Sequence, residues 1–223
     1  MTVAYLDPHQ ASGKRAAAHD RKRHQILDAA ARVFRHLGYD GTSMNEVASS
    51  AGVSKPTLYA YFESKEVLFQ AIVEYTRPAQ PELALALDPR DPDMAGQLSR
   101  YGRGLVRLII SPENIAIMRM VIGAVEKFPS LGRRFFSTGP HLGHRRVQAY
   151  LDALVSADRL DIPDTSLAAW QFIDLVQSPH QRIAIMEIAP PPSEAELAAT
   201  VERAVAMFLS AHRVGESQLV LST

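Results

Sequence analysis

The sequence GYDGTSMNEVASSAGVSKPTLYAYFESKEVLFQAI, residues 38–72, contains the signals for two short helices joined by a tight turn. Ser43 and Glu46 form a capping box, in which each side chain binds a free backbone amide at the start of a helix. Gly52 supplies the left-handed conformation that a sharp turn after this helix requires. Pro56 then stands in the first turn of the next helix, where its missing amide costs little. The stretch therefore predicts a helix-turn-helix, whose second helix can enter the major groove of DNA.

The side chains of this second helix are suited to nucleic acid. Lys55 and Thr57 stand at its start, where base edges are met in the major groove. Tyr59, Tyr61 and Lys65 are better suited to phosphates, the contacts that orient a protein on the duplex. We therefore expect base contacts from the first turn and backbone contacts from the tyrosines and the lysine.

Residues 38–72 resemble the DNA-binding signature of the TetR family of transcriptional regulators, and the resemblance extends more loosely over the preceding helix. It implies an all-α fold, with an N-terminal three-helix DNA-binding domain and a larger C-terminal helical domain for ligand binding and dimerisation. It also implies that the second helix meets phosphates at its start and reaches a base through Asn45. The DNA-binding positions that it implies are Thr42, Ser43, Asn45, Ser54, Lys55, Pro56, Thr57, Tyr59, Tyr61 and Lys65.

The regions on either side of the signature are also predicted to be helical. Apolar residues recur every three to four positions over residues 21–37, and Gly38 follows as a helix stop. The residues before this helix are small and polar without periodicity, and they include Lys14 and Arg15. We expect a disordered basic arm over 1–20, a DNA-binding domain over 21–76 and an effector-binding and dimerisation domain over 77–215.

Composition narrows the possible functions. The chain has 223 residues, with 24 basic and 24 acidic side chains and no cysteine. The zero net charge hides an uneven distribution, because residues 1–62 hold eight basic side chains against five acidic ones. The lack of cysteine excludes disulfides and thiolate metal sites, and no apolar run approaches the length of a membrane span. We expect a cytoplasmic protein with no cofactor, no metal and no catalytic residues.

Two helices near the C-terminus carry the signals of a dimer interface. The helix predicted over 164–178 places Trp170, the single tryptophan, on its polar side, which suggests contact with a partner or a ligand. The helix predicted over 194–212 is apolar on one side and has small residues on another, so a second helix can approach it closely. We expect these two helices to form a homodimer.

A second resemblance concerns the effector. The segment IMRMVIGAVEKFPSLGRRFFSTGP, residues 117–140, is similar to the C-terminal domain of AefR-like members of the family. The resemblance implies a pocket for a small molecule, whose identity the sequence does not specify. Met and aromatic side chains line such pockets, although they also fill ordinary cores. The candidate pocket residues are Tyr101, Met118, Arg119, Ile122, Phe136, Trp170 and Phe172.

Two other classes of function remain open from the residues. A helical enzyme with a hydrophobic cavity would use Arg119 with Glu126, or His141 with His144. No nucleophile, base and orienting group form a recognisable set, however. An adaptor protein would use the surface around Trp170. The pattern as a whole favours a homodimeric repressor that binds operator DNA and is released by a small-molecule effector.

Overall fold

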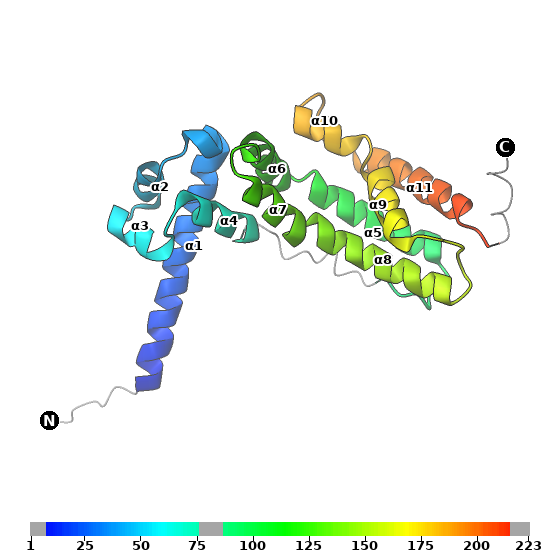
Figure 1. Ribbon diagram of the computed structural model, residues 1–223, viewed down its shortest axis with the longest axis horizontal. Coiled ribbons are helices and arrows are strands. Elements are labelled where there is room, and N and C mark those ends of the chain that lie inside the picture. The colour runs from blue at the N-terminus through cyan, green and yellow to red at the C-terminus, as the bar shows by residue number, and fades with distance from the viewer. Residues whose placement is uncertain (1–7, 76–86, 215–223) are drawn as a thin grey trace. The chain divides into compact units, whose positions relative to one another are not determined.

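The computed structural model describes the backbone of residues 8–75 and 87–214 and the side chains of residues 16–75 and 87–214. The described residues form eleven helices and no strand, which confirms the all-α prediction (Figure 1). The helices are α1 (Pro8–Gly41), α2 (Met44–Ala51), α3 (Lys55–Tyr61), α4 (Lys65–Tyr75), α5 (Met94–Ile109), α6 (Pro112–Ala124), α7 (Pro129–Thr138), α8 (Pro140–Ser156), α9 (Thr165–Gln177), α10 (His180–Met186) and α11 (Glu194–Ala211).

The chain forms two compact units. We call residues 1–77 with 120–132 the N-terminal unit, and residues 78–119 with 133–223 the C-terminal unit. The sequence predicts residues 120–132 as part of the effector domain, but in the structure they belong to the N-terminal unit. Within the N-terminal unit, the ring of Phe128 lies 4.7 Å from that of Tyr39. Helices α6 and α7 therefore each contribute residues to both units.

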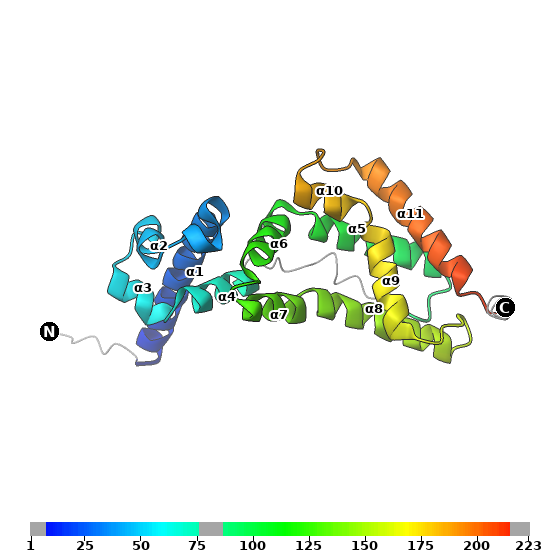
Figure 2. The ribbon, with the colours of Figure 1, turned by 45° about the horizontal axis from the view of Figure 1, so that its top comes forward.

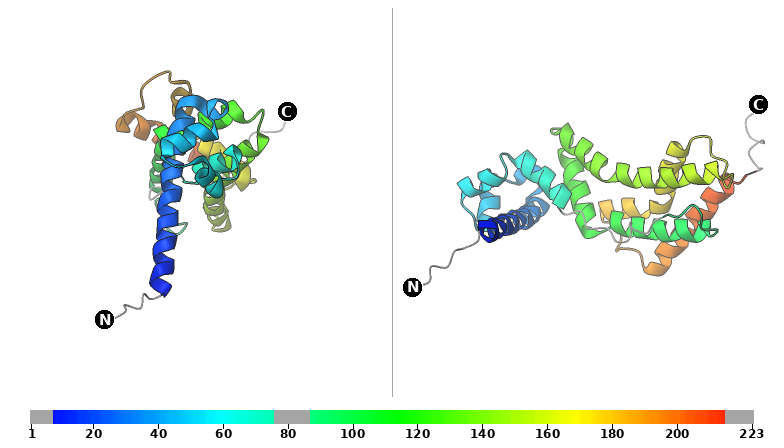
Figure 3. Two further views of the ribbon diagram at one scale, coloured as in Figure 1. Left: turned by 90° about the vertical axis from the view of Figure 1, so that its left-hand side faces the viewer. Right: turned by 90° about the horizontal axis from the view of Figure 1, so that it is seen from below.

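Helix α1 is longer than the sequence pattern predicted. It begins at Pro8, so the region expected to be a disordered arm is helical from residue 8 onward, while residues 1–7 lie outside the described ranges (Figure 3). A helical segment can form from residues with high helix propensity, such as alanine, without an apolar stripe. A prediction from apolar periodicity alone therefore missed the first turns of α1. Gly38 has a φ of 70°, which confirms that the regular helix stops there.

The helix-turn-helix forms as predicted, because its end signals act locally. The Ser43 and Glu46 side chains both make their capping hydrogen bonds at the start of α2. Gly52 adopts the left-handed conformation with a φ of 62°, and its amide donates to the carbonyls of the preceding turn. The Ser54 side chain accepts a hydrogen bond from the Thr57 amide at the start of α3. A missing cap of this kind costs about 1 kcal/mol.

The C-terminal unit is built around α5, α9 and α11. Leu98, Phe172, Val201 and Phe208 lie in one buried core, to which α8 also contributes. Figure 2 shows α9 lying beside α8 and α11 within this unit. The side of α11 predicted to be apolar packs into this core, and the small residues of its other side are exposed. They are Ala195, Ala199, Ala206 and Ser210.

A close approach between α5 and α11 depends on Gly102. A Cβ atom at this position would lie 2.9 Å from Val201 Cγ1, a distance that real contacts almost never reach. We expect Gly102→Ala to be less stable than the matched variant Gly123→Ala by about 2 kcal/mol, because a Cβ at Gly123 meets nothing within 4 Å. Urea unfolding of both variants measures the difference. A Gly102→Ala protein as stable as wild type would contradict this packing.

Candidate nucleic-acid interface

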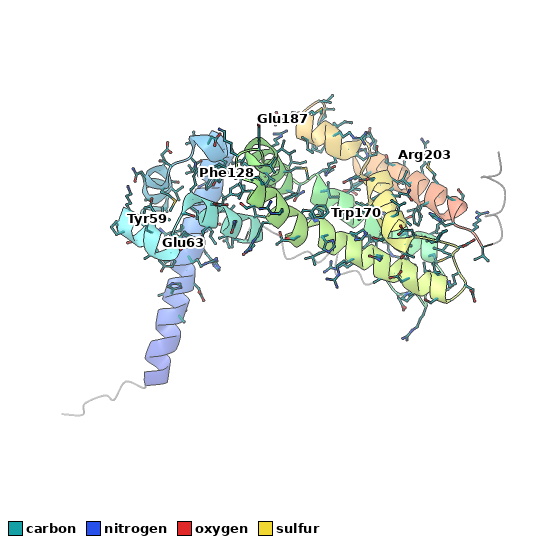
Figure 4. The ribbon with its side chains drawn as sticks, viewed as in Figure 1. Tyr59, Glu63, Phe128, Trp170, Glu187 and Arg203 are labelled. Carbon is teal, nitrogen blue, oxygen red and sulfur yellow. The ribbon has the colours of Figure 1, made fainter. Side chains whose placement is uncertain are left out.

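The exposed residues of the helix-turn-helix match most of the positions predicted to bind DNA. Six of the ten candidates are exposed on α2, on α3 and just before these two helices: Ser43, Asn45, Ser54, Lys55, Pro56 and Tyr59. Figure 4 shows Tyr59 on the surface of α3. These side chains are free to meet DNA because the opposite sides of the two helices carry the core contacts of Val47 and Leu58.

Lys55 and Tyr59 form the chemically strongest part of this surface. The Lys55 ammonium lies 6.0 Å from the centroid of the Tyr59 ring, one turn further along α3. The Tyr59 side chain is 42% exposed, so its hydroxyl and the ammonium both reach solvent. A cation and a hydroxyl presented together from a recognition helix are donors for phosphate oxygens and for base edges.

Four hydroxyl groups in the predicted set, those of Thr42, Ser43, Ser54 and Thr57, already have partners within the protein. Thr42 is buried, and its Oγ1 donates to the Gly38 carbonyl at 2.7 Å. The Ser43 Oγ accepts from the Glu46 amide, and the Thr57 Oγ1 lies 2.7 Å from the Ser54 Oγ. These contacts orient the ends of α2 and α3. Direct contacts from these hydroxyls to DNA stay a prediction.

Lys65 also has a role that sequence reasoning did not foresee. Its ammonium donates to the Tyr39 and Thr42 carbonyls at 2.8 and 3.0 Å, and it lies 4.5 Å from the Tyr39 ring centroid. Two of its three N–H groups thus tie α4 to the end of α1. Tyr61 is half-buried and its ring stacks on His19 of α1 at 4.6 Å. The predicted phosphate contacts of both residues remain untested beside these internal ones.

Two side chains of α1 support the turn of the helix-turn-helix. Gln25 Nε2 donates to the Ala51 carbonyl at 2.7 Å, immediately before the turn glycine. The Arg23 guanidinium lies 5.5 Å from the centroid of the Phe62 ring, at the end of α3. The sequence pattern gave Arg23 and Gln25 no role at the turn, because nothing local links either residue to its distant partner.

The predicted pocket residues are separated by the structure. Tyr101 and Phe172 lie in the core of the C-terminal unit, where burial raises the pKa of Tyr101 to about 12. Ile122 belongs to the N-terminal unit and is 58% exposed. Phe136 and Trp170 are brought together, with ring centroids 5.5 Å apart. These two aromatic residues remain candidates for contact with a ligand.

The last two pocket candidates connect α6 with α10. The Arg119 guanidinium donates to the Ile185 and Ala184 carbonyls at 2.8 and 2.9 Å and to the Glu187 carboxylate at 2.6 Å. Gln181 Nε2 points at the Met118 sulfur at 3.8 Å. Arg119 therefore caps the C-terminal end of α10 and holds this short helix against α6.

The residues that the structure describes form neither a metal site nor a membrane-spanning helix. Among them, no three His, Asp or Glu side chains gather in a way that could hold a metal ion. His141 and His144, which the sequence placed three apart, have ring centroids 6.0 Å apart. None of the helices within the described ranges is long and apolar enough to cross a bilayer.

Comparison with known families agrees with this geometry. Residues 26–72 match the family described as bacterial regulatory proteins, tetR family. Residues 96–214 match the family described as AefR-like transcriptional repressor, C-terminal domain. The first match covers the helix-turn-helix with most of α4, and the second covers most of the C-terminal unit together with residues 120–132 of the N-terminal unit.

Individual curated relatives match this chain over shorter stretches. The transcriptional activator FasR of Mycolicibacterium smegmatis is 47% identical over 55 residues, which are 25% of this chain and 25% of that protein. The repressor NicS of Pseudomonas putida is 38% identical over 86 residues, 38% of this chain and 41% of that protein. The chain thus spans less than half the length of these curated relatives.

Solved structures are similar over nearly the whole chain. A TetR-family transcriptional regulator from Mesorhizobium loti has a TM-score of 0.77 and 28% identity, covering 87% of this chain and 98% of that one. The flavonoid-responsive regulator FrrA has a TM-score of 0.74 and 29% identity, covering 88% of this chain and 99% of that one. The similarity therefore includes both units.

Proposed function

Since this chain belongs to the TetR family of transcriptional regulators, with an AefR-like C-terminal domain, we propose that it is a DNA-binding repressor released by a small-molecule effector. The observation that carries the proposal is the exposed pair of Lys55 and Tyr59 on α3. This pair stands on the second helix of a helix-turn-helix, the helix that enters the major groove in proteins of this architecture.

The repressor acts as a homodimer through α9 and α11. The exposed small residues of α11 would let a second copy approach closely, as in other symmetric interfaces. Two recognition helices then read two half-sites about 34 Å apart, one turn of DNA, or a multiple of that distance. A pseudo-palindromic operator follows from this symmetry.

Effector binding acts on DNA affinity through linkage. In one conformation of the dimer, the two recognition helices are not spaced to fit the two half-sites. A ligand that binds this conformation more tightly lowers the operator affinity, by a factor set by its ratio of affinities for the two conformations. Helix α6 supports such a connection, because it contributes residues to both units. The segment that follows α6 is bound within the N-terminal unit, where Lys127 pairs with Asp40 at 2.5 Å and Ser130 donates to Glu66. A small organic effector is supported by the name of the flavonoid-responsive relative FrrA.

The proposal is tested by binding of the purified protein to the DNA upstream of its own gene. Fluorescence anisotropy over a salt series measures the affinity and its ionic contribution. We expect binding at least about 1,000-fold tighter than to a scrambled fragment, weakening steeply as salt rises. Equal affinity for both fragments at every salt concentration would reject a specific regulator and favour the adaptor or enzyme alternatives.

A further inference from the structure

Helices α7, α8 and α9 bring four aromatic side chains together in the C-terminal unit. We call Phe136, His141, His144 and Trp170 the aromatic cluster. Each ring is stacked on two others, with centroids 4.3 to 6.2 Å apart and planes 14° to 27° from parallel. Aromatic pairs at these separations attract one another when the rings are offset. The cluster therefore presents flat apolar surfaces in a common orientation. Figure 4 labels Trp170, its member on α9.

The cluster extends from the surface into the interior. Phe136 is 48% exposed and His141 is exposed, whereas Trp170 is half-buried and His144 is only 4% exposed. A ligand ring between Phe136 and Trp170 requires the exposed Phe136 ring to turn outward into solvent. Such a rotation would free a face of Trp170, the ring that now lies 5.5 Å from it.

His144 has an unused hydrogen-bonding atom inside this cluster. Its Nε2 lies 2.9 Å from the Ser166 carbonyl oxygen, which can only accept, and 3.3 Å from the Ser166 hydroxyl; the shorter contact assigns the ring proton to Nε2. In the neutral ring the other nitrogen, Nδ1, is then an acceptor. It is buried and has no hydrogen-bond partner among the described residues. A buried acceptor without a donor is costly, and native proteins rarely leave one.

The chemistry of these groups specifies a class of ligand. A flat ring is needed to stack on Trp170, and a hydroxyl group is needed to donate to Nδ1 of His144. A phenol supplies both in one molecule. Around Phe136, His141 and His144, residues 133–151 contain four Arg residues and no Asp or Glu.

We propose that the aromatic cluster binds a planar phenolic compound, held between Phe136 and Trp170 with its hydroxyl donating to His144 Nδ1. The proposal rests on the proposed function, because such a compound would be the effector. It adds the chemical class of the ligand and the role of His144 as hydrogen-bond acceptor, which neither the family nor the sequence assigns.

The experiment compares two probes with the same ring, one whose oxygen carries a proton and one whose oxygen carries a methyl group. Isothermal titration calorimetry of the full chain with 2-naphthol and with 2-methoxynaphthalene measures affinity for the same ring with and without a donor. We expect 2-naphthol to bind roughly tenfold more tightly, the effect of one hydrogen bond to a buried acceptor. Equal affinities, or no binding of either probe, would overturn the proposal.

Three variants locate the site. His144→Phe keeps a ring beside Trp170 but removes the acceptor, so the preference for 2-naphthol should disappear. Phe136→Leu should lower the affinity for both probes several-fold, because one stacking ring is lost. Leu142→Ala is the control, since Leu142 is 45% exposed in the same region but belongs to none of the ring contacts. Thermal unfolding by circular dichroism verifies each fold. A folded His144→Phe protein that retains the preference contradicts the assignment, and a Phe136→Leu protein with unchanged affinity does so even if His144→Phe fails to fold.

Operator binding separates this inference from the proposed function. The same wild-type protein is tested on its upstream DNA without a probe. Specific DNA binding with no preference for 2-naphthol rejects the phenol site alone. A 2-naphthol preference without specific DNA binding rejects the repressor and leaves the site standing.

Discussion

We expect the double variant Lys55→Ala, Tyr59→Ala to lose at least about 100-fold in operator affinity while its thermal unfolding stays unchanged. Both side chains are exposed on α3, so removing them opens no cavity. Each contact is lost twice in a dimer, and each base or phosphate contact is worth roughly 1 to 3 kcal/mol. The salt dependence should also become shallower, because a cation that neutralises a phosphate is gone.

Anisotropy on the upstream DNA measures this loss, and Arg90→Ala provides the control. Arg90 is exposed in the C-terminal unit, so its removal also deletes one positive charge, but outside the candidate interface. The operator affinity of the Arg90→Ala protein should remain within about twofold of that of the wild type. A double variant that binds as tightly as the Arg90→Ala protein would show that α3 is not the reading helix.

The second large effect concerns the dimer, which Met207→Arg should dissociate. Met207 is 59% exposed in a single chain and lies beside the small residues of α11. In the proposed interface an arginine there would be buried without a partner, which costs several kcal/mol. Light scattering should give twice 24.6 kDa for wild type and 24.6 kDa for the variant at micromolar concentration.

Operator binding of Met207→Arg should fall by about 100-fold or more, because one recognition helix then binds without the effective concentration supplied by the other. Leu142→Arg is the matched control, since it places the same charge on a comparably exposed leucine of α8. It should stay dimeric and bind DNA normally. A wild-type protein that is monomeric, or a Met207→Arg dimer, would refute the interface on α11.

Local features of the fold followed directly from the sequence. The capping box of Ser43 and Glu46, the turn at Gly52 and the stop at Gly38 all act over a few residues, so their residue types specify the backbone. The start of α1 was predicted wrongly, because an exposed helix rich in alanine leaves no periodic pattern.

The candidate DNA interface was only partly predictable. Lys55 and Tyr59 are exposed as their helical positions predicted. The ammonium of Lys65 binds the carbonyls of Tyr39 and Thr42 instead of standing free at the surface. These partners lie 26 and 23 residues earlier in the chain. A local sequence pattern cannot predict contacts between residues so far apart.

By itself the sequence determined most of the helices, the helix-turn-helix with its caps and turn, and the family, because caps, turns and periodicity are local properties of the chain. Only the tertiary structure decided that residues 120–132 pack with the N-terminal helices and that Phe136 meets Trp170. The same holds for the unpaired nitrogen of His144, which lies within this cluster. Such features depend on which distant side chains share one space, and packing of the whole chain sets that.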